Sequence, residues 1–251
     1  MVHSTLQQDL RVGVAIFIVC VGPFLDLPLM KQMRAERTSL LRLRFYRYGG
    51  ASLWVIGLTC FALMGWHGLV RLSAVLVDLG VLGKMGWRIG MAVVSGAFFV
   101  VGLMPGVVCL FRARSRVAYT RAVAKSEISF MLPLGVRERR WFALISVSAG
   151  VWEEVICRGF LMTFARGELH LGLLLALVVT SVAFGFNHLY QGLGGIVKTS
   201  VIGLMLGFVA VLSGGLLVPM ILHAAIDLQI LAMYQPEVGD GGHLGAAESI
   251  T

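Results

Sequence analysis

Long apolar runs dominate this chain and decide what it can fold into. Each run holds about 18 to 25 residues, and roughly 20 apolar residues in a helix cross the ~30 Å hydrocarbon core of a bilayer. A soluble domain carries roughly 25% charged residues, whereas this chain carries 14% and is 58% hydrophobic. We therefore expect an all-α fold, a polytopic bundle of transmembrane helices. The seven predicted spans are 11–30, 48–66, 89–111, 141–165, 169–189, 194–212 and 215–234.

The stretches between these runs are too short to form a soluble domain. Residues 1–251 are therefore predicted to form a single membrane-embedded domain. One further segment, Leu69 to Leu82, is apolar but is interrupted by Arg71, Ser73 and Asp78. It is either an interfacial helix or a partial eighth span.

The formal net charge of +8 is unevenly distributed along the chain. Of the 21 Lys and Arg residues, six lie in 31–47 and eight in 112–140. Two predicted spans separate these stretches, so both fall on one side of the membrane, which the positive-inside rule identifies as the cytoplasm. We interpret the basic residues as a topology signal and as contacts for anionic lipid head groups, with membrane lipid as a partner and no nucleic acid.

Ionisable side chains inside the spans are the most informative residues for function. Each costs roughly several kcal/mol in a bilayer unless it is paired or functional. Apart from Asp26 in the first span, the acids and histidines within the spans all lie in the fourth, fifth and seventh spans, where Arg158 joins them. The clustered residues are Glu153, Glu154, Arg158, His188, His223 and Asp227.

The fourth span contains two adjacent acids. Glu154 and Arg158 stand at i and i+4, with the acid first, which is the favourable order for a helical ion pair. Glu153 points about 100° away around the helix and has no local partner, so it suits general-base work. The alternative is a structural polar network that joins helices.

Two histidines follow at helical spacing from other motif residues. Phe184 and His188 share one face of the fifth span, and His223 and Asp227 share one face of the seventh. Alone, a histidine near a helix end, such as His188, is more often an interfacial residue or a hydrogen-bonded core residue than a catalyst. The His223–Asp227 pair could likewise be a simple hydrogen bond. Together with Glu153, these side chains could activate water and stabilise an oxyanion, or bind zinc through Glu153, His188, His223 and Asp227.

These segments resemble the CPBP family of intramembrane proteases, which includes the CAAX prenyl protease of the Ras-converting type and bacterial relatives. The family pattern is Glu-Glu-x-x-x-Arg, then Phe-x-x-x-His, then His-x-x-x-Asn or Asp. Here the three motifs are Glu153 to Arg158, Phe184 to His188 and His223 to Asp227, in that order. The resemblance covers about 140–234, the predicted protease core.

The resemblance implies a role for each motif residue. Glu153 would activate water with help from His188, Glu154 and Arg158 would shape the site, and His223 with residue 227 would stabilise the oxyanion. Asp donates a hydrogen bond only when it is protonated, unlike Asn. Asp227 must therefore hold a proton, orient His223 or act as a metal ligand.

The predicted span boundaries create a geometric conflict. If the fourth span begins at Trp141, Glu153 lies ~18 Å from the cytoplasmic end at ~1.5 Å per residue, whereas His188 lies near that end of its own span. The two meet only if the boundaries shift or a water-filled cavity reaches inward from the cytoplasm. We favour the cavity, because hydrolysis requires water.

The sequence thus predicts a metalloprotease-like, glutamate-type endopeptidase that cleaves a membrane-associated protein or peptide, with zinc as a candidate cofactor. We expect it in a bacterial cytoplasmic membrane, with its site open to the cytoplasm. One alternative is a non-catalytic scaffold or bacteriocin-immunity protein on the same fold. Another is a small transporter with a proton relay through Glu153 and His188, although the chain lacks an obvious inverted repeat.

Overall fold

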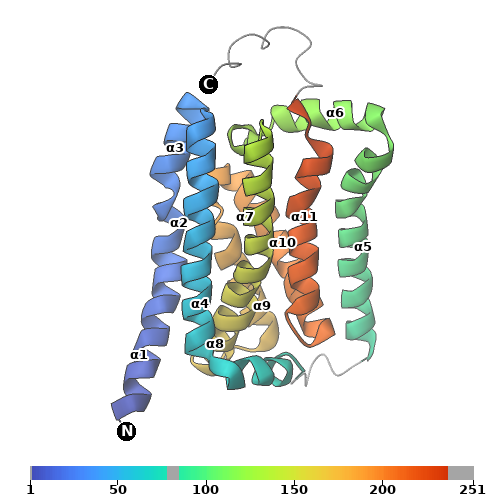
Figure 1. The fold of residues 1–251 in the computed structure, drawn as a ribbon. Coiled ribbons are helices and arrows are strands. Elements are labelled where there is room, and N and C mark those ends of the chain that lie inside the picture. The colour runs from blue at the N-terminus through green and yellow to red at the C-terminus, as the bar shows by residue number, and fades with distance from the viewer. Residues whose placement is uncertain (1, 78–84, 237–251) are drawn as a thin grey trace.

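The computed structural model describes residues 2–77 and 85–236, and every regular element within these ranges is a helix. The predicted all-α fold is therefore confirmed. Figure 1 shows the long helices running along a common axis, with shorter segments lying across both ends of the bundle.

Four helices in the described part of the chain are long and apolar enough to cross a membrane. They are Leu6–Glu36, Ser39–Gly65, Gly86–Phe111 and Leu189–Ser213. They correspond to the first, second, third and sixth predicted spans. Two further apolar helices, Leu173–Phe186 and Leu217–Met233, are shorter. The predicted total of seven spans is thus not confirmed and stays a prediction.

The first of these helices is interrupted twice. α1 (Val2–Ile16) continues through a π-helical turn, η1 (Phe17–Val21), into the short α2 (Gly22–Leu25). A turn at Asp26 then leads to α3 (Leu27–Glu36). Prolines stand in the first turns of both α2 and α3, where a missing backbone N–H costs no helical hydrogen bond. The interruptions therefore follow from the sequence.

Helix α4 (Ser39–Val77) is broken at Gly65, whose φ of 67° and ψ of 167° suit glycine. Beyond this break, the helix lies across the end of the bundle (Figure 1). This orientation agrees with the interfacial alternative for the segment that begins at Leu69. Residues 78–82 of that segment lie outside the described residues.

At the opposite end of the bundle, α6 (Ala113–Ala124) follows α5 (Met85–Phe111) and lies across the helix ends. The junction of α3 and α4 lies at this same end (Figure 1). The two basic stretches, 31–47 and 112–140, therefore share one end of the molecule, as the sequence predicts. That this end faces the cytoplasm stays a prediction.

The segment that carries the motifs consists of closely packed helices. α7 (Val136–Glu154), the π-helix η3 (Val155–Leu161) and α8 (Met162–Gly167) follow one another without a break. α9 (Leu173–Phe186), the short η4 (Leu189–Gln191), α10 (Gly192–Ser213) and α11 (Leu217–Met233) complete the segment. α7 packs on α4 and α11, and α9 packs on α10.

Buried and half-buried polar contacts join the helices at the basic end of this segment. Arg42 of α4 donates from two nitrogens to the carboxylate of Glu138, at 2.8 and 3.1 Å. Glu138 also accepts the backbone N–H of Leu134 at 2.7 Å, which satisfies a donor just before α7. Arg139 donates to the carbonyl oxygens of Leu231 and Tyr234 at the end of α11, at 2.5 and 2.9 Å. These contacts join α4, α7 and α11 above the motif residues.

Candidate active site

Small residues bring α7 and α11 together beside the two motif acids. A Cβ added to Gly150 would lie 2.7 Å from both the Cβ and the backbone nitrogen of Ala224. Glu153 and Glu154 follow at the end of α7, and the π-helix η3 begins at the next residue. Short π-helical stretches within α-helices occur frequently at functional sites. The close packing sets the carboxylates of α7 against the polar face of α11.

Glu154 joins two of the three motifs. Its side chain is fully buried, and its Oε1 accepts a hydrogen bond from Arg158 Nη1 at 2.8 Å. The predicted i,i+4 ion pair is therefore present. The same oxygen lies 2.9 Å from Nδ1 of His223 on α11. Because a carboxylate can only accept, Nδ1 carries the proton and donates it.

Arg158 is held from two further directions. Its Nη2 donates to the carbonyl oxygen of Gly203 on α10 at 2.5 Å. Its guanidinium carbon lies over the Phe184 ring of α9, 4.9 Å from the centroid, which is a cation–π geometry. Arg158 therefore fixes α10 and α9 relative to the glutamates. The contact between Arg158 and the Gly203 carbonyl was not predicted from the sequence. The one sequence feature that could have indicated it is the glycine at 203, which permits close approach.

The second ring nitrogen of His223 faces the other two acids. Nε2 lies 3.7 Å from Oε2 of Glu153 and 3.9 Å from Oδ2 of Asp227. The His223–Asp227 pair predicted from the sequence is thus a near approach without a hydrogen bond. The partner that orients the imidazole is Glu154, because the contact between Gly150 and Ala224 lets the ring reach α7.

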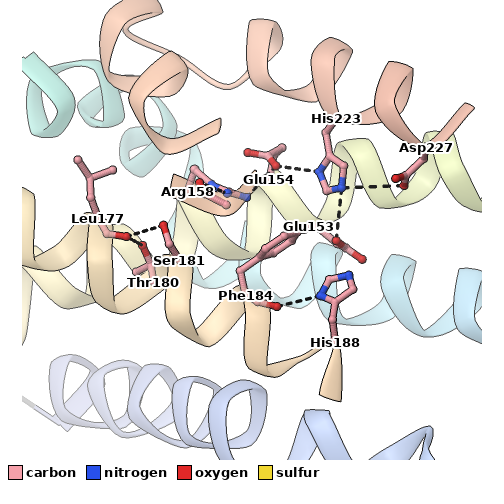
Figure 2. Close-up of polar contacts among 11 residues, drawn as sticks. Glu153, Glu154, Arg158, Leu177, Thr180, Ser181, Phe184, His188, His223 and Asp227 are labelled. Carbon is pink, nitrogen blue, oxygen red and sulfur yellow. Dashed lines mark hydrogen bonds and ion pairs between the residues drawn. The ribbon is translucent and has the colours of Figure 1, made fainter. Parts of the chain in front are cut away.

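Glu153 differs from Glu154 in its exposure and in forming no hydrogen bond with the described residues. Its side chain is 20% exposed, whereas that of Glu154 is 0% exposed. Its Oε2 is buried and accepts no hydrogen bond from the described residues. Figure 2 shows this carboxylate between the rings of His223 and His188. Glu153 is therefore the acid that remains available to a bound molecule.

His188 lies beside Glu153, and the conflict over its depth is resolved by where α9 ends. This helix has only 14 residues and stops at Phe186, so His188 lies in the turn before η4. Its Nδ1 lies 2.9 Å from the carbonyl oxygen of Phe184, which can only accept, so Nδ1 is the donor. In the neutral ring, Nε2 is left as an acceptor. Figure 2 shows the imidazole on the Glu153 side of the turn.

The four side chains predicted as zinc ligands do not converge on one point. Within the described residues, no group of three or more His, Cys, Asp and Glu side chains is placed to hold a metal ion. As they lie, Glu153, His188, His223 and Asp227 thus do not fit a preformed metal site. Zinc binding by these residues stays a prediction, and no step below is routed through a metal.

The fold and these contacts define a helical membrane protein with a buried carboxylate–histidine site, an arrangement typical of hydrolases that activate water. Residues 137–229 match the family model described as type II CAAX prenyl endopeptidase Rce1-like. This segment is therefore similar to the Rce1-like proteases, and the match confirms the resemblance inferred from the three motifs. Searches of curated proteins and of solved structures gave no match.

Proposed function

We propose that this protein is an intramembrane endopeptidase of the CAAX-processing type, or a bacterial equivalent, which hydrolyses a peptide bond with water activated by Glu153 and His188. The observation that carries the proposal is the free Oε2 of Glu153, buried beside two imidazoles. A buried oxygen without a protein partner is suited to holding a water molecule. The Rce1-like match supports the choice of peptide-bond hydrolysis.

The nucleophile would be a water molecule between Glu153 and His188. Glu153 accepts one proton of this water, while the unprotonated Nε2 of His188 accepts a hydrogen bond from the other. The water oxygen then forms a bond to the peptide carbonyl carbon. When the tetrahedral intermediate collapses, the C–N bond breaks and Glu153 returns its proton to the leaving amine. The reaction consumes only the peptide and one water molecule, and Glu153 ends in the protonation state in which it began.

The oxyanion would be stabilised by His223. Its Nδ1 proton is committed to Glu154, so Nε2 donates only when the ring is an imidazolium. Three carboxylates lie within 4 Å of this ring, at 2.9, 3.7 and 3.9 Å, which favours its positive charge. Asp227 thereby acts through the charge of His223, and Glu154 acts as a positioning residue.

The non-catalytic alternative is not favoured, because every motif residue is present and the Glu153, His223 and Asp227 side chains face one another. A scaffold would not need a carboxylate that forms no hydrogen bond with the described residues. The substrate is expected to be a membrane-associated protein or peptide. A prenylated CAAX peptide is the first to test, because the matching family is described as CAAX prenyl endopeptidases.

The test is a cleavage assay with purified protein, using a prenylated CAAX peptide and the same peptide without its prenyl group. Wild type should release the C-terminal fragment, and Glu153→Ala should not. A zinc chelator in parallel samples tests the predicted cofactor. Equal cleavage by wild type and Glu153→Ala would contradict the mechanism, and chelator-sensitive cleavage would require a metal to be added to it.

A further inference from the structure

A polar pocket lies at the basic end of the bundle, apart from the motif residues. It has a volume of about 470 Å³ and is formed where the end of α3 meets the segment after α6. Arg34, Arg37 and Lys125 line it together with Glu127, Ser129 and Phe130. We call these six residues the basic pocket. Three cations and one acid give it an excess of positive charge.

Arg34 is fixed in place before any ligand binds. Its Nη2 donates to the carbonyl oxygen of Tyr190 at 2.6 Å, and its Nη1 lies 3.3 Å from Glu127. Its guanidinium carbon lies 4.7 Å over the Phe130 ring. A guanidinium held in this way loses little conformational freedom when it binds an anion.

The backbone of Arg37 is fixed as well. Its φ of 50° places it in the left-handed region, and its N–H donates to Met33 at the end of α3. Its carbonyl oxygen accepts from Arg42 at 2.7 Å. The side chains of Arg37 and Lys125, by contrast, have no hydrogen bond or ion pair with the described residues. The pocket thus contains two cations whose charge is not paired by any residue that the structure describes.

We propose that the basic pocket binds a phosphate group, presented by the head group of an anionic phospholipid. Phosphate oxygens accept several hydrogen bonds at once and match the donor fork of arginine. The pocket stands where the first two apolar spans, Leu6–Glu36 and Ser39–Gly65, meet at the basic end. Residues that flank the end of an apolar span are expected at the depth of the head-group phosphates, where basic residues attract anionic lipid.

The experiment is native mass spectrometry of the full chain in a neutral detergent. The protein is titrated with phosphatidylglycerol or with phosphatidylcholine of the same acyl chains. The test variant is Arg37→Gln with Lys125→Gln. Arg114→Gln with Arg121→Gln is the matched control, because it removes the same charge from exposed residues of α6 outside the pocket. Melting temperatures should match wild type for both double variants, since none of these side chains has a partner among the described residues.

Wild type should bind phosphatidylglycerol in preference to phosphatidylcholine. The apparent Kd should rise about tenfold or more in the pocket variant and no more than about twofold in the control. Equal binding of the two lipids by wild type, or equal losses in both variants, would overturn the proposal. A titration with inorganic phosphate, with the melting temperature as the readout, distinguishes a lipid head group from free phosphate as the ligand. If only free phosphate binds, and only when the pocket is intact, the lipid source is rejected.

Discussion

The two adjacent glutamates should respond very differently to the same substitution. Glu154→Gln keeps an oxygen that can accept from Arg158 and His223, but it removes the charge that balances a buried guanidinium. Breaking a buried pair from one side costs about 3–5 kcal/mol. We expect the lower part of this range, because Arg158 keeps its Gly203 carbonyl and its contact with Phe184. At about 2–4 °C per kcal/mol, the melting temperature should fall by about 6–12 °C.

Glu153→Gln should leave stability nearly unchanged. Its Oε2 accepts no hydrogen bond from the described residues and lies 3.7 Å from His223 Nε2. We therefore expect a change of about 0.5 kcal/mol or less, together with a loss of turnover of ~10²-fold or more, because the amide is not a base. The assays are the melting temperature in detergent and the specific activity of each purified variant.

Replacing both Glu154 and Arg158 with neutral residues separates stability from positioning. The double variant should recover stability better than either single change, since no unpaired charge remains. Activity should stay low, because the Nδ1 proton of His223 loses its carboxylate partner. If Glu153→Gln destabilises the protein as much as Glu154→Gln does, or retains full activity, the assigned roles are wrong.

Three further predictions test other parts of the structure. Ser115→Cys, in a cysteine-free background, should not be labelled by a membrane-impermeant maleimide in intact cells and should be labelled after permeabilisation. Labelling in intact cells would contradict the predicted topology. Gly150→Val should separate α7 from α11, lower the free energy of unfolding by about 1–3 kcal/mol and abolish activity. The control Gly102→Val, which has open space around it, should be active. A fully active Gly150→Val would contradict the packing argument. Burial raises the pKa of Glu138, but hydrogen bonds from Arg42, the Leu134 N–H and Ser39 outweigh it and hold the pKa below its usual 4.5. This stabilisation is present above pH 4.5 and is lost as the pH falls through the lower pKa of the folded state. The melting temperature of wild type should therefore fall more steeply below pH 4.5 than that of Glu138→Gln. Parallel curves for the two proteins would count against a stabilising Arg42–Glu138 ion pair.

Helical periodicity alone predicts the contacts of the site that lie within one helix. The i,i+4 spacing of Glu154 and Arg158 predicts an ion pair, and the pair is present at 2.8 Å. Spacing of this kind fixes which side chains share a face, so local pairs are accessible from sequence. The helical fold followed from the apolar runs in the same way.

Contacts between helices were less accessible. The sequence paired His223 with Asp227, its neighbour on the same helix, whereas the imidazole donates to Glu154, which lies 69 residues away in the chain. That contact depends on how closely α7 approaches α11, and periodicity does not report interhelical distance. The position of His188 was missed for a related reason, since an apolar run does not reveal that α9 stops at Phe186.

The π-helix after the glutamates sets the rotational register between the two parts of the motif helix. Its seven residues, Val155–Leu161, contain a wider turn than the α-helical segments on either side. Deleting one residue here would relax the turn to an ordinary helix, so both flanks could keep their packing while Glu153 and Arg158 rotate relative to each other. A one-residue deletion in η3 should therefore destabilise the fold less than a deletion in α7. It should nevertheless abolish activity. The register of this helix, rather than its stability, is what the extra residue sets.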